Sequence, residues 1–129
     1  MRIILLTLAA FVFSIPAALA QADLSECSVK INFGSYAMGI DTDGYTAIRE
    51  IIDNSKEVDT YTDISWGREG ERTICVQTYS MQASDALYND LLRHVPNRSE
   101  TAWTEIIHED GRSQKTHWPD NSRTKMPKI

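Results

Sequence analysis

The sequence predicts an α+β domain in which two helices pack on one face of an antiparallel sheet. Apolar residues recur in some segments with the two-residue period of strands and in others with the longer period of helices. The resulting order is strand, helix, strand, strand, helix, strand, which is the split βαβ pattern (βαββαβ) of ferredoxin-like folds. In that arrangement the fourth, first, third and second strands lie side by side in this order. A glycine-containing hairpin lies at the middle of the chain, and an extra edge strand follows the last strand.

The first strand and the first helix follow from local patterning. Residues 28–33 alternate between polar and apolar side chains, which predicts a strand with one buried face. The apolar side of this strand comprises Val29, Ile31 and Phe33. After a loop of small residues, 34–39, Asp41 or Asp43 can cap a helix that extends to about Ser55. The apolar stripe of that helix comprises Tyr45, Ile48, Ile51 and Ile52.

The central hairpin consists of two segments rich in β-branched and aromatic residues, Val58 to Trp66 and Arg72 to Tyr79. Gly67 to Glu71 lies between them. Its two glycines permit a tight reversal, and its three charged side chains favour a tip in water. In the second strand, alternation places Cys75 on the face opposite its apolar neighbours.

The second helix and the fourth strand continue the pattern. Met81 to Val95 carries apolar residues at helical spacing. Ser80 is a candidate N-cap for this helix, and Ser84 is the alternative if the helix starts later. The helix should stop at Pro96, and a strand over about Thr101 to Glu109 follows.

A return strand is predicted after Asp110-Gly111, a dipeptide typical of two-residue hairpin turns. Residues 112–118 would then form a polar edge strand. With this turn His108 faces Ser113, and by the same pairing His117 faces Thr104. The three histidines are therefore predicted at the surface and not as a pair of metal ligands. They are His94, His108 and His117.

A secretory signal peptide is predicted over residues 1–20. Arg2 precedes a nearly unbroken apolar run, and Ala18-Leu19-Ala20 is a small-x-small cleavage site. The run is short for a membrane anchor, which needs about 20 residues. Cleavage would leave a single α+β domain over residues 21–118 and a disordered basic tail over residues 119–129. We therefore expect a periplasmic or secreted protein with no stable membrane anchor.

Two cysteines in an exported chain predict one disulfide, between Cys27 and Cys75. It would close a loop of about 48 residues and stabilise the fold by ~4 kcal/mol in the chain-entropy description. Neighbouring first and third strands would bring the two cysteines together. Strand alternation conflicts with this pairing, because it places Cys27 on the face of Val29 and Cys75 on the opposite face. A bulge, or a Cys27 that precedes the strand, would remove the conflict.

The charge distribution restricts the class of partner. The chain has a net charge of −5, and its acidic residues lie almost entirely before Gly111, whereas residues 112–129 are basic. Binding to nucleic acid requires a basic surface, so the acidic body argues against that class. We expect the partner to be an unknown protein or a cell-envelope component, and the basic end to be a solvated tail.

The sequence shows no catalytic or metal-binding signature, and no cofactor is expected. Residues 39–50 partly match a calcium-binding loop, but a glycine occupies the position of the first acidic ligand. The matching positions are Asp41, Asp43, Gly44 and Glu50. A helix N-cap with acidic residues near the positive end of the helix dipole explains the same pattern. No Gly-x-Ser-x-Gly sequence is present, and both cysteines are assigned to the disulfide.

Residues 31–65 loosely resemble the peptidoglycan-binding domain of the outer-membrane-protein-A type. The likeness consists of Phe33, an Asp-Gly loop, and an amphipathic helix that leads into a strand. The family's helix motif, Leu-Ser-x-x-Arg-Ala, is absent, because the corresponding residues 81–88 read Met-Gln-Ala-Ser-Asp-Ala-Leu-Tyr. The arginine that would hold the peptide carboxylate has no counterpart, so the family's function is not carried over to this chain.

The candidate binding site is the hairpin tip. A tryptophan beside arginine and glutamate on a glycine-containing turn has the composition of a recognition hot spot. The residues expected to contact a partner are Trp66, Arg68, Glu69 and Arg72. The alternative is a core tryptophan at a strand end followed by a solvated turn. Of the other tryptophans, Trp103 is predicted in the core and Trp118 over the edge strand.

Together these features predict a small exported, disulfide-stapled binding or interaction protein without catalytic activity. It would act through the hairpin tip and the exposed face of the sheet. The alternatives are a small exported enzyme, a metal-dependent protein, or an envelope- or peptidoglycan-associated module.

The signal peptide makes a direct prediction about the exported protein. Cleavage after Ala20 should give a mature N-terminus at Gln21, and cleavage after Ala22 would give Asp23 instead. N-terminal sequencing or intact mass of the exported protein measures this. An exported protein that still starts at Met1 would contradict it.

Overall fold

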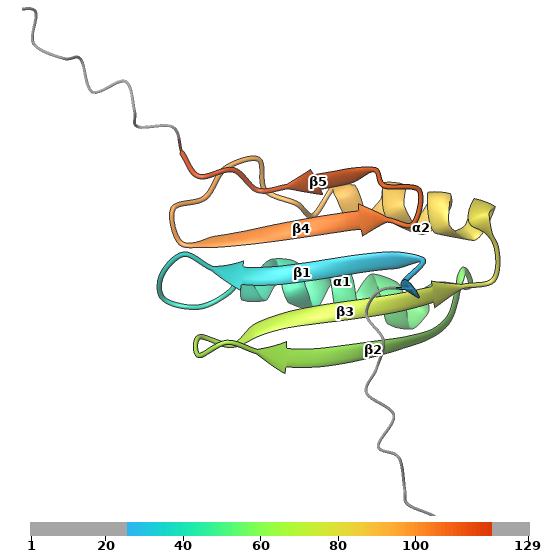
Figure 1. Cartoon of the computed structure of the whole chain (residues 1–129), viewed down its shortest axis with the longest axis horizontal. Helices are drawn as coiled ribbons and strands as arrows, with labels where there is room; N and C mark the ends of the chain where they lie inside the picture. Colours follow the sequence, from blue (N-terminus) through green and yellow to red (C-terminus); the bar gives the residue numbers. More distant parts are fainter. Residues whose placement is uncertain (1–25, 120–129) are drawn as a thin grey trace, which may run out of the picture.

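Five strands and two helices make up the described part of the chain, residues 26–119, in this computed structural model (Figure 1). The elements are β1 (Val29–Ser35), α1 (Thr42–Asn54), β2 (Val58–Trp66), β3 (Glu71–Thr78), α2 (Met81–Leu92), β4 (Ala102–His108) and β5 (Ser113–Lys115). The strands form one antiparallel sheet in the order β2-β3-β1-β4-β5. The predicted α+β class, with two helices and an antiparallel sheet, is confirmed. The short strand β5 adds a fifth strand to the predicted six-element pattern.

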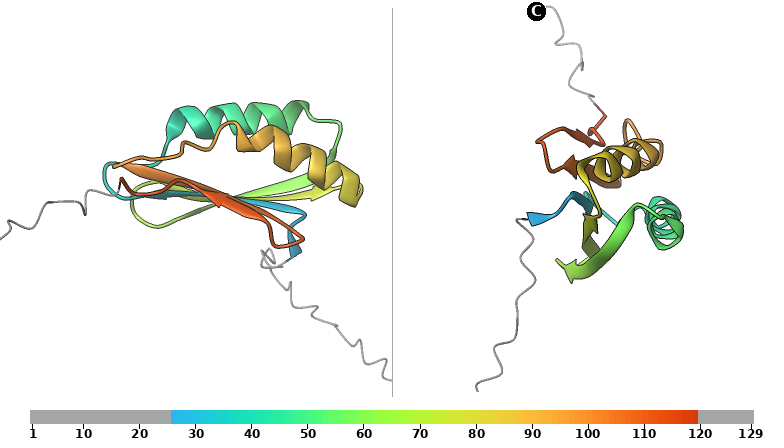
Figure 2. Two further views of the ribbon diagram at one scale, coloured as in Figure 1. Left: turned by 90° about the horizontal axis from the view of Figure 1, so that it is seen from above. Right: turned by 90° about the vertical axis from the view of Figure 1, so that its right-hand side faces the viewer.

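Both helices pack on the same face of the sheet, as the side view shows (Figure 2). Strand β1 lies between β3 and β4 and supplies three side chains with no exposed surface. These are Val29, Ile31 and Phe33, the residues that alternation predicted. The helices add Ile48 and Ile52 from α1 and Leu87 and Leu91 from α2. Truncating one such core residue to alanine typically costs about 2–5 kcal/mol.

Both helices begin at the capping residues that the sequence offered. The Asp41 carboxylate accepts a hydrogen bond from the backbone N–H of Gly44 at 3.0 Å, so the acidic loop is used as a helix cap. The Ser80 hydroxyl accepts one from the N–H of Ala83 at 3.1 Å. Helix α2 ends at Leu92, three residues before the predicted end. The backbone there tightens into bonds that span three residues, such as that from the Val95 N–H to the Leu92 carbonyl.

The β4–β5 turn differs from the prediction. The backbone N–H of His108 donates to the carbonyl of Arg112 at 2.8 Å, which leaves a three-residue loop. Gly111 closes this loop with a φ of 96°. Loops of three residues with a left-handed glycine are the next most common hairpin turns after two-residue ones. An Asp-Gly pair fits either loop length, so the predicted two-residue turn was wrong by one residue.

This shift of one residue in the β4–β5 pairing moves every side chain of the return strand to the opposite face of the sheet. Ser113 pairs with Ile107 and not with His108, and the strand is shorter than the predicted residues 112–118. The prediction of a surface position for His108 was also wrong. The residue is 1% exposed, because it lies on the side of the sheet that carries the helices.

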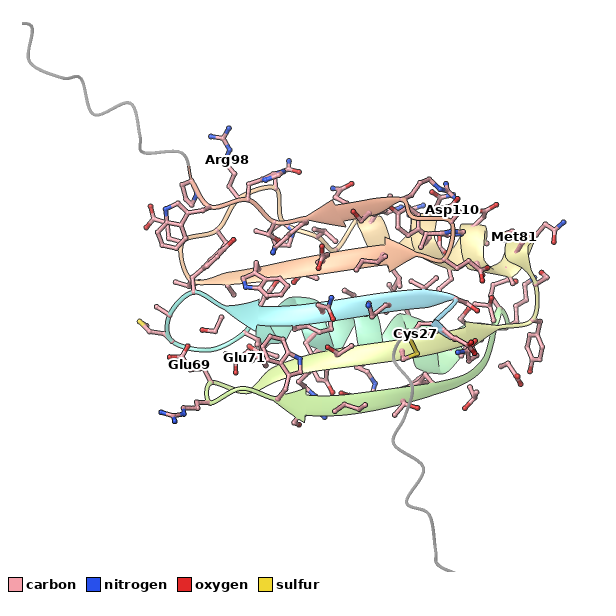
Figure 3. All side chains as sticks on the ribbon, in the orientation of Figure 1. Cys27, Glu69, Glu71, Met81, Arg98 and Asp110 are labelled. Atoms are coloured by element: carbon pink, nitrogen blue, oxygen red, sulfur yellow. A yellow bond between two sulfur atoms is a disulfide. The ribbon has the colours of Figure 1, made fainter. Side chains whose placement is uncertain are left out.

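The predicted disulfide between Cys27 and Cys75 is present. Cys27 lies before the first residue of β1, so the conflict with strand alternation does not arise. Cys75 pairs with Lys30 across the β1–β3 ladder and points away from the helices. The crosslink therefore joins the segment before β1 to β3, on the side of the sheet that faces the viewer in Figure 3.

Some expectations lie outside the described residues. The signal peptide over residues 1–20 and nearly all of the tail over residues 119–129 belong to this part of the sequence. Neither helix within residues 26–119 has the length and apolar character needed to cross a membrane.

The disulfide should make a large contribution to stability. Replacing Cys75 with serine should lower the free energy of unfolding by up to ~4 kcal/mol, because the unfolded chain regains the freedom that a 48-residue loop closure removes. Urea denaturation of the wild type and of Cys75→Ser measures the difference. The two proteins should unfold at the same urea concentration once the wild type is reduced. Rapid alkylation of two thiols in the folded, non-reduced protein would show that the link is absent.

Candidate binding surface

One face of the sheet is covered by neither α1 nor α2, and we call it the helix-free face (Figure 2). Because Val29, Ile31 and Phe33 point into the core, their neighbours on β1 point to this face. Cross-strand pairing then places side chains from all five strands beside them. The helix-free face carries Lys30, Asn32, Thr62, Ile64, Trp66, Thr73, Gln77, Trp103, Glu105, Ile107 and Lys115.

A chain of side-chain hydrogen bonds crosses four strands of the helix-free face. The indole N–H of Trp66 donates to the Thr73 hydroxyl at 3.0 Å. That hydroxyl donates to the Asn32 side-chain carbonyl at 2.8 Å, and the Asn32 amide donates to the Glu105 carboxylate at 3.2 Å. Each group in this polar ladder fixes the next, so Trp66 and Glu105 are both held in one orientation.

The two tryptophans of the helix-free face lie close together. The ring centroids of Trp66 and Trp103 are 6.5 Å apart, with the planes tilted by 43°. Trp103 packs directly on Gly34, where an added Cβ would lie only 2.0 Å from the indole. The Lys115 ammonium lies 4.1 Å from the centroid of the Trp103 ring. Trp103 is thus held between backbone and cation, whereas Trp66 is 42% exposed.

The hairpin tip adjoins Trp66 and is tied to the central strand. The side chains of Arg68 and Glu69 are exposed, and the Ser35 hydroxyl at the end of β1 donates to the Glu69 carboxylate. The backbone N–H of Glu69 donates to the Glu71 carboxylate at 2.8 Å. Gly67 and Gly70 have φ values of 69° and 84°, which supports their predicted role in the reversal. The tip is therefore an ordered turn and not a free loop.

The structure separates Arg72 from the other predicted contact residues. On β3 it shares the face of Ile74 and so points to the side of the helices. Its Nε–H donates to the Asp63 carboxylate at 2.8 Å. Trp66 points to the opposite side of the sheet, where it bonds to Thr73. Trp66, Arg68 and Glu69 thus lie at one end of the hairpin, and Arg72 belongs to a different cluster.

Sequence reasoning missed exposed apolar residues in the β1–α1 loop beside the tip. Met38 is 91% exposed and has a φ of 68°, an unusual conformation for a residue with a side chain. Tyr36 packs edge-on against Trp118 with ring centroids 4.8 Å apart. Trp118 therefore contacts this loop, in contrast to its predicted place over the edge strand. Trp103 likewise lies on the helix-free face and not in the predicted core position.

The cluster that contains Arg72 joins α1 to β2 and β3. Asp63 accepts hydrogen bonds from the Tyr45 hydroxyl and from Arg49, each at 2.6 Å. Arg49 also donates to the Tyr61 hydroxyl at 2.7 Å. Asp63 is thus bound on both sides by guanidinium groups, with only 11% of its side chain exposed. This pattern of paired charges and aromatic rings holds the helix against the hairpin.

Electrostatics keep Asp63 ionised in this cluster. Burial alone would raise the pKa of its carboxyl. The hydrogen bonds from Tyr45 and Arg72 and the charges of Arg72 and Arg49 outweigh burial, so the pKa of Asp63 lies below its ordinary value. Burial and the neighbouring Asp63 carboxylate raise the pKa of Tyr45, which stays a neutral donor.

A second group of polar side chains lies in the part of the molecule where α2 meets the β4–β5 turn. It contains Asp85, His108 and Asp110, whose ligand atoms all lie within 4.8 Å of one another. Asp110 is labelled in Figure 3, at the end opposite Glu69 and Glu71. Because His108 was predicted at the surface, sequence reasoning missed this group.

Comparison with known proteins identifies no relative of this chain. No protein family matches this sequence, and no curated protein or solved structure matches the chain. The chemistry and geometry of residues 26–119 are therefore the basis for assigning a function.

The Asp63 cluster predicts a defined dependence of stability on pH. A carboxyl whose folded pKa is lowered stabilises the fold above its unfolded pKa, and this contribution disappears as the pH falls through the folded value. Asp63→Asn should therefore destabilise by about 2–3 kcal/mol at neutral pH, because it leaves two guanidinium groups without their shared partner. Urea denaturation at several pH values measures the difference.

The difference between Asp63→Asn and the wild type should begin to shrink below about pH 4, where the carboxyl of the unfolded chain becomes protonated. It should disappear once the pH falls through the lowered pKa of Asp63 in the folded protein. Asp59→Asn is the matched control, because Asp59 is an exposed carboxylate on the same strand. This control should change the free energy of unfolding by no more than ~0.5 kcal/mol. A loss for Asp63→Asn that is the same at all pH values would show that shape and not charge is responsible.

Proposed function

We propose that the chain is a small exported, disulfide-stapled binding protein without catalytic activity. Its binding surface is the helix-free face around Trp66 and Trp103, together with the adjoining hairpin tip. One observation carries this proposal: Trp66 is exposed and yet fixed by the polar ladder that ends at Glu105. An aromatic side chain that is both solvent-facing and ordered is typical of a recognition hot spot.

The energetic reason is preorganisation. Binding costs free energy whenever side chains must be immobilised, by about 0.5–1.5 kcal/mol for each flexible one. Trp66 is already held through Thr73, and Trp103 is held between Gly34 and Lys115. A partner that buries these rings therefore gains apolar burial at little entropic cost.

The chemistry of the face favours a partner with both apolar and hydrogen-bonding groups. The exposed indole of Trp66 offers apolar surface, while Asn32, Glu105 and Lys115 offer an amide, a carboxylate and an ammonium near the two indoles. A protein or a component of the cell envelope meets this description. Nucleic acid does not, because the chain is acidic, with a net charge of −5.

Two further features support export and the finer fold assignment. A disulfide persists in the oxidising compartments that exported proteins reach.

We also infer that the fold is a ferredoxin-like arrangement extended by the edge strand β5. The central position of β1 between β3 and β4 supports this assignment.

The binding surface can be tested with variants that separate binding from folding. Mature protein is immobilised, exposed to an envelope fraction, and the retained component is identified and quantified. Trp66→Ala should weaken its capture by about 2 kcal/mol, and Arg68→Ala by a smaller amount, because both side chains contact the partner. Arg68→Ala should leave the thermal midpoint nearly unchanged, since its side chain is exposed.

Tyr79→Ala is the matched control for the loss of an exposed aromatic ring. Tyr79 is 69% exposed and lies in the β3–α2 connection, at the opposite end of the hairpin from the tip (Figure 1). This variant should capture as much as the wild type. If Trp66→Ala and Arg68→Ala capture as much as Tyr79→Ala and the wild type, the helix-free face and the tip are not the binding surface.

A further inference from the structure

The polar group at the α2 end of the molecule has the composition of a metal site. Asp85 comes from α2, His108 from the last residue of β4, and Asp110 from the β4–β5 turn. The three-residue turn brings Asp110 back over His108. One imidazole and two carboxylates thus come together, with Asp85 brought from a helix that is distant in sequence from the other two residues. This end lies away from the proposed binding surface, and the inference does not depend on that proposal (Figure 3).

His108 has a buried nitrogen that is aimed into this group without a hydrogen bond. Its side chain has no exposed surface. The Nε2 atom lies 2.9 Å from a carboxylate oxygen of Asp85, yet it has no hydrogen-bond partner. The oxygen is close enough but lies off the direction in which the ring N–H would point. A buried polar atom without a partner is costly, by about 1–3 kcal/mol, and such atoms call for an explanation.

The contacts of the other ring nitrogen decide which nitrogen of His108 carries the proton. Nδ1 accepts a hydrogen bond from the backbone N–H of Asp110 at 3.0 Å. Nδ1 also lies 2.9 Å from the Asp110 carboxylate, which can accept a hydrogen bond when Nδ1 carries the proton. Nδ1 therefore has a partner in either tautomer. While Nδ1 accepts the bond from the Asp110 N–H, the proton of the neutral ring is on Nε2, so a cation that binds at Nε2 must displace that proton.

We propose that Asp85, His108 and Asp110 form a binding site for Zn²⁺ or a similar borderline divalent cation. Imidazole nitrogen and carboxylate oxygen together are the ligands that Zn²⁺ takes in sites with open positions. Zinc binds both at about 2.0–2.2 Å in tetrahedral geometry, so two of its ligand atoms are separated by about 3.4 Å. The ligand atoms here lie within 4.8 Å of one another, so the carboxylates must turn toward the ion when it binds.

Arg112 binds the same two carboxylates and would compete with the ion for them. Its guanidinium donates to Asp85 and, at 2.7 Å, to Asp110. The Arg112 side chain is 48% exposed, so it can swing into solvent when a cation replaces it. The site thus contains a built-in competitor that neutralises the carboxylates while no metal is bound.

The mature, disulfide-bonded protein is titrated with Zn²⁺ alone. Calorimetry measures binding, and the thermal midpoint is measured with and without the ion. Wild type should bind one ion and melt at a higher temperature when the ion is present. Asp85→Asn should bind at least about tenfold more weakly, because it removes a charged ligand. Arg112→Gln should bind several-fold more tightly, because it removes the competing cation. A purely structural ion-pair group would show the opposite pattern, with Arg112→Gln less stable and no ion bound.

Matched variants separate this site from other sources of zinc binding. His94→Gln combined with His117→Gln should bind like the wild type, because both residues lie outside the group. Asp90→Asn should also have no effect, although Asp90 is an acidic residue on the same helix. Ca²⁺ should bind much more weakly, since it prefers six to eight oxygen ligands.

A spectroscopic readout covers the residue that is hardest to substitute. His108→Gln changes a buried side chain and could fail to fold, so the wild-type ring nitrogens are observed by NMR instead. Zinc should shift the Nε2 resonance of His108 and leave those of His94 and His117 in place. The proposal is overturned if millimolar Zn²⁺ leaves the Nε2 resonance unchanged, or if Asp85→Asn binds as tightly as the wild type.

Discussion

The alternation of strand β1 is the constraint on which the rest of the structure depends. β1 pairs with β3 on one side and β4 on the other, so every residue in it has neighbours in both directions. Burying Val29, Ile31 and Phe33 beneath the helices forces the residues between them to the helix-free face. A shift of one residue in the pairing register of β1 would expose three large apolar side chains, at a cost of about 1.5–3 kcal/mol each. The hydrophobic core thus fixes the register of both central ladders.

The helix-free face inherits its organisation from this register. Asn32 lies between Thr73 and Glu105 because it is paired with both, and its amide can therefore link the two neighbouring strands. Gly34 faces Trp103 for the same reason, and the absence of a side chain at Gly34 lets the indole lie flat on the backbone. The disulfide acts beside this surface, since Cys75 is the partner of Lys30. Core packing and surface order are thus two consequences of one pairing.

The parts of this arrangement that the sequence predicted are those set by local chemistry. Alternation identified the buried side of β1, and the caps at Asp41 and Ser80 marked the helix starts. Two cysteines in a chain with a predicted secretory signal were sufficient to predict the crosslink. Each of these depends on a few consecutive residues or on composition. None requires knowledge of which strands are neighbours.

The errors arise where a single residue of register decides the outcome. Asp110-Gly111 suits both two-residue and three-residue hairpins, and the choice between them decides the pairing of His108. Arg72 is a different case, because alternation from Ile74 already placed it on the side of the helices. Arg72 was grouped with Trp66 because the two residues are close in sequence. The two-residue period of strands predicts the face of Arg72 correctly. The contact of Trp103 with Gly34 depends on a long-range register that local patterns do not contain.

The two arginine–aspartate clusters show how similar residues can serve different purposes. In one, Arg49 and Arg72 enclose Asp63, and the hydroxyls of Tyr45 and Tyr61 complete the network. Its one buried nitrogen without a partner is Nε of Arg49, which is part of a cation and cannot bind a metal ion.

The other cluster also leaves one buried nitrogen without a partner, but this atom belongs to the imidazole of His108. An imidazole nitrogen can lose its proton and offer a lone pair, and two carboxylates lie beside it with their charge balanced by the half-exposed Arg112. The first cluster is therefore a closed structural link between helix and hairpin. The second has the donor atoms of a ligand site, and the difference follows from placing a histidine where the other cluster has an arginine.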